Sequence, residues 1–319
     1  MMSFGKEKMA PIKAIMALTI VADHLGLFYG INAFKLFVEL GAPIVSVFFF
    51  ISGYGLHISY KNKGDSYLKS FFSRRFWIVL APYLLATLLF LLLFWPSADC
   101  LKKAVYATFS AGVPILPFSW FALEILYFYL AFYISFRLLP ERWKVIGLCL
   151  LIVVLMIAFF FLGYGNAWWV SSLAFPAGVI FAGNEKKLFS AVDKRQGMLW
   201  ISLLVLMAVF FVSYLVGRVF GKYYVWTVSH VCIALMVAIL VSWLPLERLN
   251  SKPLAFLAKI SFEIYLCQGI AMQVLRGRFH ILNDFIFVVL VYALTIALAW
   301  GIHLLSGLLT RKPCTSSTT

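Results

Sequence analysis

Long apolar segments are the feature of this sequence that most restricts its fold, because they recur along nearly all of its 319 residues. A helix needs about 20 predominantly apolar residues to cross the hydrocarbon core of a bilayer, and ten segments reach or approach that length. Only 12% of the residues are charged, whereas about 25% is usual in soluble domains. The chain is therefore predicted to be an all-α, polytopic integral membrane helical bundle. The composition excludes a soluble enzyme, a disordered chain and a nucleic-acid-binding protein.

The predicted membrane helices leave little room for a separate soluble domain. They cover residues 10–29, 40–58, 76–96, 117–138, 145–163, 167–183, 197–217, 224–244, 253–273 and 283–309. The polar stretches between them are loop-sized, so we expect one transmembrane domain over residues 1–319, with the lipid bilayer as its surroundings. Residues 310–319 are expected to form a disordered cytoplasmic tail.

Basic residues are divided unevenly between the two sides of the predicted bundle. With the N-terminus in the cytoplasm, 19 of the 27 Lys and Arg residues fall in inside segments and 7 in outside segments, while Lys13 lies within the first helix. Loops rich in Lys and Arg stay on the cytoplasmic side, which also explains the net charge of +15 without a nucleic-acid partner. The split predicts ten spans, two cytoplasmic termini and a multi-pass protein of the cell (inner, cytoplasmic) membrane.

Lys13 and His24 form the most informative pair of ionisable residues inside a predicted span, where such groups are costly and usually functional. They lie 11 residues apart, which on an α-helix places them on one face to within about 20° and roughly 16 Å apart along the axis. Such a pair can line one passage, and histidine is the best general base near neutral pH. Alternatively, Lys13 snorkels to the interface and His24 makes a structural hydrogen bond.

Three cations, Lys69, Arg74 and Arg75, stand at the cytoplasmic start of the third predicted helix. Guanidinium groups match the geometry of phosphate, so these residues are candidates for holding a phosphorylated ligand. The positive-inside rule, or contact with anionic lipid headgroups, also explains them.

Several other polar side chains in the predicted spans are candidates for lining a site. Ser52 and Tyr54 lie at the inner end of the second span, where helix packing through small residues is the alternative. Trp120 and Glu124 are four residues apart and share a helix face. Glu124 can be a proton acceptor, a partner for His24 or a structural group. Glu263 brings a carboxylate to the inner half of the ninth span.

Two further intramembrane imidazoles, His230 and His303, have no recognisable sequence surroundings and are expected to be structural. The cysteines form no CxxC pair and no His-spaced pattern, so the sequence predicts no metal site. It does not indicate an oligomeric state.

Five segments, taken in order, resemble the membrane acyltransferases of the acyltransferase-3 family. They are KAIMALTIVADH, VSVFFFISGYGL, KSFFSRRFWIVLAPY, LPFSWFALEILYFYLAFY and LAKISFEIYLCQ. The first is similar to the family's basic-x10-His pattern, with Lys13 and His24 in its two positions. Each motif alone is weak, but together they cover most of the chain, so we expect a standalone family member without an appended extracellular domain.

The resemblance implies transfer of an acyl group, usually acetyl, from cytoplasmic acyl-CoA to a hydroxyl of a carbohydrate or lipid-linked sugar. Acetyl-CoA would be a donor substrate, and no permanently bound cofactor is implied. His24 would deprotonate the attacking hydroxyl or carry the acyl group, with Glu124 as a second proton-transfer candidate. Lys13, Lys69 and the Arg74–Arg75 pair would bind the acyl-CoA.

The chain departs from the family pattern at two places. Ile78 and Val79 occupy the region where the third helix often carries another Arg, and Gln268 stands where the late segment often ends in His. Two other functions fit buried polar groups in ten helices: a transporter or flippase for a lipid-linked or small polar substrate, and a family member without catalysis. Transporters often show internal repeats and interrupted helix pairs, and neither is evident in the sequence.

Overall fold

The computed structural model describes residues 4–94, 96–194, 196–249 and 251–310, and this part of the chain contains helices and no strand. The α-helices are α1 (Lys6–Tyr29), α2 (Gly41–Lys63), α3 (Asp65–Lys69), α4 (Trp77–Phe94), α5 (Ala98–Ser110), α6 (Trp120–Leu138), α7 (Glu141–Phe161), α8 (Ala167–Val170), α9 (Ala174–Lys194), α10 (Gln196–Phe220), α11 (Trp226–Trp243), α12 (Lys252–Lys259), α13 (Ser261–Gln273) and α14 (Asp284–Thr310). Short 3-10 or π segments join them: η1 (Asn32–Phe37), η2 (Phe72–Phe76), η3 (Tyr223–Val225), η4 (Leu246–Leu249) and η5 (Val274–Arg278). The predicted tail over 310–319 lies outside the described residues, apart from Thr310, which ends α14.

The prediction of an all-α polytopic membrane bundle is confirmed. Among the described helices, eight are long and apolar enough to cross a bilayer. The joined helices α12 and α13 also satisfy this requirement, but the chain bends by 74° at the break between them. Counted as one span, this bent pair gives nine.

The predicted span over 167–183 is where the structure differs from the sequence analysis. This segment divides into the four-residue helix α8 and the first part of α9. Helix α9 has 21 residues but does not qualify as a span, because its second half carries Asn184, Glu185, Lys186 and Lys187. Its apolar first half packs along α2, the most extensive helix pairing in the described bundle.

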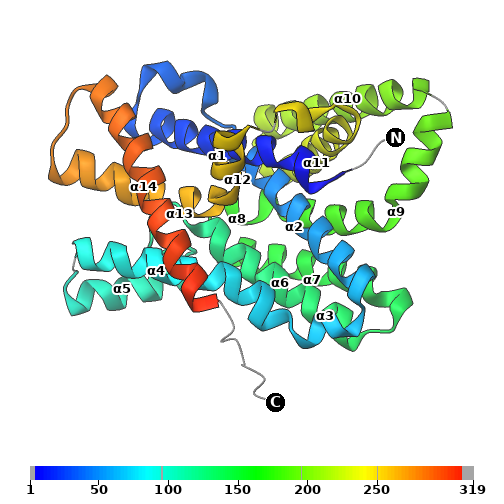
Figure 1. Cartoon of the computed structure of the whole chain (residues 1–319), viewed down its shortest axis with the longest axis horizontal. Coiled ribbons are helices and arrows are strands. Elements are labelled where there is room, and N and C mark those ends of the chain that lie inside the picture. Colours follow the sequence, from blue (N-terminus) through cyan, green and yellow to red (C-terminus); the bar gives the residue numbers. More distant parts are fainter. Residues whose placement is uncertain (1–3, 95, 195, 250, 311–319) are drawn as a thin grey trace, which may run out of the picture.

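Helices α1, α12 and α13 occupy the middle of the molecule, with α4 and α5 at one side and α9 at the other (Figure 1). Helix α1 contacts α2, α11, α12 and α13, so its residues can face cavities formed with several neighbours. Many phenylalanines fill the spaces between helices, and Phe49, Phe50, Phe128 and Phe175 are fully buried. In lipid, such packing rather than water exclusion holds helices together.

Two glycines make the close crossing of α2 and α9 possible. A Cβ atom on Gly53 would lie 2.1 Å from the backbone oxygen of Phe175, and one on Gly178 would lie 2.1 Å from the backbone oxygen of Phe50. Real Cβ atoms essentially never come that close to another atom. The two backbones therefore touch where each helix presents a glycine, as small residues allow in membrane bundles.

This crossing predicts that Gly53→Ala destabilises the protein while Gly55→Ala, two residues along the same helix, does not. A Cβ atom on Gly55 meets nothing within 4 Å, whereas overpacking at Gly53 should cost about 1–3 kcal/mol or more. Thermal unfolding of the purified variants in detergent, followed by size-exclusion chromatography, measures the difference. Equal unfolding temperatures for the two variants would contradict the proposed contact.

Candidate functional site

A cavity of about 330 Å³ lies among α1, α2, α4, α6, α12, α13 and α14, and we call it the Lys13 cavity. Most of its wall is apolar, and its charged or titratable side chains are those of Lys13, Tyr129, Lys259, Glu263, Tyr265 and His303. Ser52 and Ser261 add hydroxyl groups. Lys13, Lys259 and His303 come from helix ends that the charge distribution predicts to be cytoplasmic. A cavity this size with few polar groups is typical of small-molecule sites.

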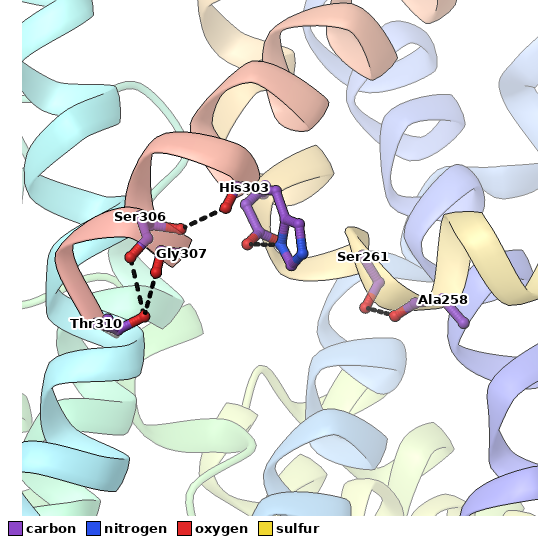
Figure 2. Close-up of polar contacts among 7 residues, drawn as sticks. Ala258, Ser261, His303, Ser306, Gly307 and Thr310 are labelled. Atoms are coloured by element: carbon purple, nitrogen blue, oxygen red, sulfur yellow. Dashed lines mark hydrogen bonds and ion pairs between the residues drawn. The ribbon is translucent and has the colours of Figure 1, made fainter. Parts of the chain in front are cut away.

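Glu263 and His303 form a close pair in the wall of this cavity. The His303 ring points from α14 toward the break between α12 and α13 (Figure 2), and its Nδ1 lies 2.8 Å from Oε1 of Glu263. Trp300 lies nearly parallel to the imidazole, with ring centroids 5.8 Å apart and an angle of 15°. Two neighbours therefore fix the orientation of the ring. The sequence predicts only a structural role for His303 and gives no sign of this pairing.

A second cavity, of about 280 Å³, contains His24, and we call it the His24 cavity. Its polar and aromatic lining comprises Asp23, His24, Phe28, Glu39, Trp120, Asn166, Tyr214, Trp226, His230 and Tyr265. Glu39, Trp120, Asn166 and Trp226 lie next to loops that the charge distribution predicts to be outside. Because His24 follows Lys13 by 11 residues on α1, the His24 cavity lies toward the other end of this helix.

Glu39 carries the negative charge at the loop side of the His24 cavity. Its Oε2 accepts a hydrogen bond from the Tyr214 hydroxyl at 2.6 Å, and its Oε1 lies 2.7 Å from Nη1 of Arg218. Both contacts favour the ionised carboxylate, so they hold the pKa of Glu39 below its usual value. The loop before α2 is thereby tied to α10.

The His24 imidazole is held mainly by ring packing. It stacks on Phe118, with centroids 4.5 Å apart and an angle of 28°. Nε2 lies 3.9 Å from the Asp23 carboxylate, beyond hydrogen-bond distance, and within the described chain Nδ1 has no hydrogen-bond partner. The Gln268 side chain lies close enough to interact with the ring, but its Oε1 also lacks a hydrogen bond there. Buried polar groups are nearly always bonded, and the Nδ1 of His24 is an exception to that rule within the described chain.

One layer of side chains separates the two cavities. Ile20, Val45 and Tyr265 line both of them, and all three are at least nine-tenths buried. Lys13 and His24 thus lie on one helix, as the spacing predicts, but face two compartments that meet at Ile20.

Phe118 adopts a left-handed backbone conformation, with φ of 63°, which is unusual for a residue with a large side chain. Its backbone oxygen accepts a hydrogen bond from the Tyr265 hydroxyl, and that hydroxyl accepts one from the Phe121 backbone N–H at 3.3 Å. Strained backbone of this kind persists where its surroundings enforce it, often at functional sites. Tyr265 therefore fixes the turn that carries Phe118, and the Phe118 ring packs against His24.

Two of the other candidate residues line the cavities and two do not. Ser52 lines the Lys13 cavity and Trp120 the His24 cavity. Glu124 is fully buried and lines neither; its Oε1 accepts a hydrogen bond from Ser172 at 2.8 Å. Tyr54 also lines neither, and its hydroxyl lies 2.8 Å from Oε2 of Glu185.

The three cations before α4 lie outside both cavities. Lys69 and Arg74 are exposed, and Arg75 donates a hydrogen bond to Ser59 at 3.0 Å. The π-helical turn η2 carries both arginines and leads directly into α4. Ile78 and Val79, one turn further on, line the Lys13 cavity. The basic turn is therefore connected to the cavity wall by about one turn of helix.

The bundle and its paired cavities define a polytopic membrane protein with a buried polar site. Residues 12–304 match the family described as the acyltransferase domain, the acyltransferase-3 family, and the chain therefore belongs to that family of acyltransferases. Comparison with curated proteins gives no match, and comparison with solved structures gives none either. Family membership supports an enzyme that transfers acyl groups and disfavours a transporter.

The Tyr265–Phe118 contact predicts that Tyr265→Phe slows acyl transfer without unfolding the protein. The change removes one hydroxyl, after which the left-handed turn at Phe118 loses its hydrogen bond and His24 loses its fixed neighbour. We expect a loss of roughly tenfold or more in kcat, in line with the sensitivity of catalysis to misplaced groups. Tyr292→Phe is the matched control, because the Tyr292 hydroxyl donates to the Leu18 backbone oxygen on α1 at 3.1 Å. An equal loss in both variants would contradict a specific role for Tyr265.

Proposed function

We propose that this membrane acyltransferase is an O-acyltransferase that moves an acyl group, most simply acetyl, from cytoplasmic acyl-CoA to a hydroxyl on the far side of the membrane. The acceptor would be a carbohydrate of the cell surface or a lipid-linked sugar, and the protein would reside in the cytoplasmic membrane. The observation that carries this proposal is the pair of cavities that meet at Ile20, Val45 and Tyr265.

The two cavities suit two substrates that approach from opposite sides. A donor made in the cytoplasm and an acceptor beyond the bilayer can react only if their reactive ends come together within the membrane. The Lys13 cavity would take the acyl end of the donor, and the His24 cavity would take the acceptor hydroxyl. Only the shared layer, in which Ile20 is 2% and Val45 3% exposed, would have to shift for the two to meet.

His24 would act as the general base in this reaction. A neutral imidazole can take the proton of the acceptor hydroxyl as its oxygen attacks the thioester carbonyl carbon. Tyr265 and Phe118 would hold the ring, and Trp120 would offer a flat apolar surface to the acceptor. Glu124, which bonds to Ser172 away from both cavities, would support the helix that carries Trp120.

The basic turn before α4 would bind the phosphates of the CoA moiety. The Lys13 cavity, at about 330 Å³, accommodates the narrow end of an acyl-CoA rather than its nucleotide. The nucleotide would then lie near the membrane surface, within reach of Lys69, Arg74 and Arg75. Lys13 would provide a positive charge for polar atoms of the donor inside the cavity.

The proposal predicts that His24→Gln abolishes acyl transfer in protein that is inserted and folded normally. Glutamine keeps a polar side chain of similar reach but cannot take a proton, and loss of a general base typically costs 10²–10⁴-fold. The assay follows CoA release from acetyl-CoA by purified protein, with and without extracted cell envelope as acceptor source. His57→Gln, at the half-buried end of α2, is the control. Transfer by His24→Gln at the wild-type rate per folded molecule would overturn the catalytic assignment.

A second prediction concerns the donor. Arg74→Ala combined with Arg75→Ala should raise the KM for acetyl-CoA about tenfold or more, since a charge-assisted hydrogen bond contributes about 1.5–3 kcal/mol. The control is Lys61→Ala with Lys63→Ala, which removes two exposed positive charges from the same predicted side of the membrane. If both double variants change the KM equally, a general surface charge effect replaces the proposed phosphate site.

A further inference from the structure

We propose that His303, oriented by Glu263, is the acid that protonates the CoA sulfur as the acyl group leaves. This inference rests on the proposed function and adds a second proton-transfer residue on the donor side. It assigns a catalytic role to His303 and a positioning role to Glu263.

The geometry of the pair supports an oriented acid. Oε1 of Glu263 lies 2.8 Å from Nδ1 of His303, so an ionised Glu263 accepts the Nδ1–H bond and leaves Nε2 as the working nitrogen. A carboxylate that fixes the orientation and tautomer of a histidine in this way is a recurring arrangement in acyl transfer. The His303 side chain is 25% exposed and the Glu263 side chain 9%, and both line the Lys13 cavity, so the imidazole is accessible to a ligand there while the carboxylate stays largely enclosed.

The surroundings of the pair place it where the leaving group would be. His303 and Glu263 line the cavity proposed for the acyl end of the donor. The other charged groups of that cavity are Lys13 on α1 and Lys259 on α12, whereas α2, α4 and α6 contribute none. Lys259 is directed toward the indole of Trp300, with its Nζ 5.5 Å from the ring centroid. His303 thus supplies the imidazole of this cavity, and its ring packs against the indole of Trp300.

The chemistry needs a proton at this point. The C–S bond breaks with its electron pair on sulfur, and an unprotonated thiolate is costly in a largely apolar cavity. A thiolate is a stronger base than a neutral imidazole, so a proton on Nε2 can pass to the departing sulfur. The products are the free CoA thiol and neutral His303, which regains its proton from cytoplasmic water. The new C–O bond forms at the acceptor oxygen, whose proton passes to His24.

The test compares His303→Gln with wild type on two donors, acetyl-CoA and S-(4-nitrophenyl) thioacetate, whose aromatic thiolate leaves without needing a proton. We expect at least a hundredfold loss of kcat with acetyl-CoA and less than a tenfold loss with the activated ester. Glu263→Gln should give the same ordering with a smaller loss. His57→Gln serves as the control for loss of an imidazole elsewhere in the bundle. Equal losses on both donors would indicate a structural role and overturn the proposal, as would turnover of acetyl-CoA by His303→Gln at the wild-type rate.

If the enzyme does not accept the small activated ester as a donor, a pH profile of kcat with acetyl-CoA tests the proton-donor role of His303. A required imidazolium makes the wild-type kcat fall as the pH rises, and His303→Gln should lack that alkaline decline. The same decline in both proteins would refute the role of His303. Failure of the broader function would look different, because wild-type protein would then release no CoA with envelope present, and His24→Gln would change nothing.

Discussion

The cost of placing polar groups in lipid is the constraint on which the rest of this structure depends. Each charged or hydrogen-bonding side chain inside the bilayer must face protein, water or a partner. The bundle meets this requirement by turning residues such as Lys13, His24 and His303 toward two internal cavities and by pairing the buried Glu124 with Ser172. Exposed positions along α7 and α10, such as Leu150, Phe161 and Leu204, remain apolar. The site is therefore a direct result of the same sorting that makes the chain a membrane protein.

The layer of Ile20, Val45 and Tyr265 is where the two cavities produced by this sorting meet. A continuous polar channel would let water and ions across the bilayer, whereas here buried side chains lie where the two cavities meet. Tyr265 has a place in both the partition and the support of His24, because its hydroxyl fixes the backbone of Phe118.

Sequence reasoning predicted the fold class because hydropathy acts over each segment separately, and it predicted the shared face of Lys13 and His24 because helical spacing is fixed. It did not predict that α9 fails as a span, since its first half is apolar and only the polar run after Ala182 changes the outcome. Nor could it pair Glu263 with His303, which are 40 residues apart on α13 and α14. Contacts of that kind depend on how α13 and α14 pack, and no local pattern records them.

The apolar pair Ile78 and Val79 shows how a departure from a family pattern can be interpreted physically. Both side chains line the Lys13 cavity, so replacing a cation there makes this wall apolar and removes one site for phosphate inside the bundle. The cavity nevertheless keeps Lys13 and Lys259, against the single carboxylate of Glu263. On the proposed function, the apolar wall favours a narrow, weakly polar part of the donor in the cavity. Recognition of its phosphates would then fall to the basic turn before α4, where Arg74 is exposed and its charge need not be desolvated.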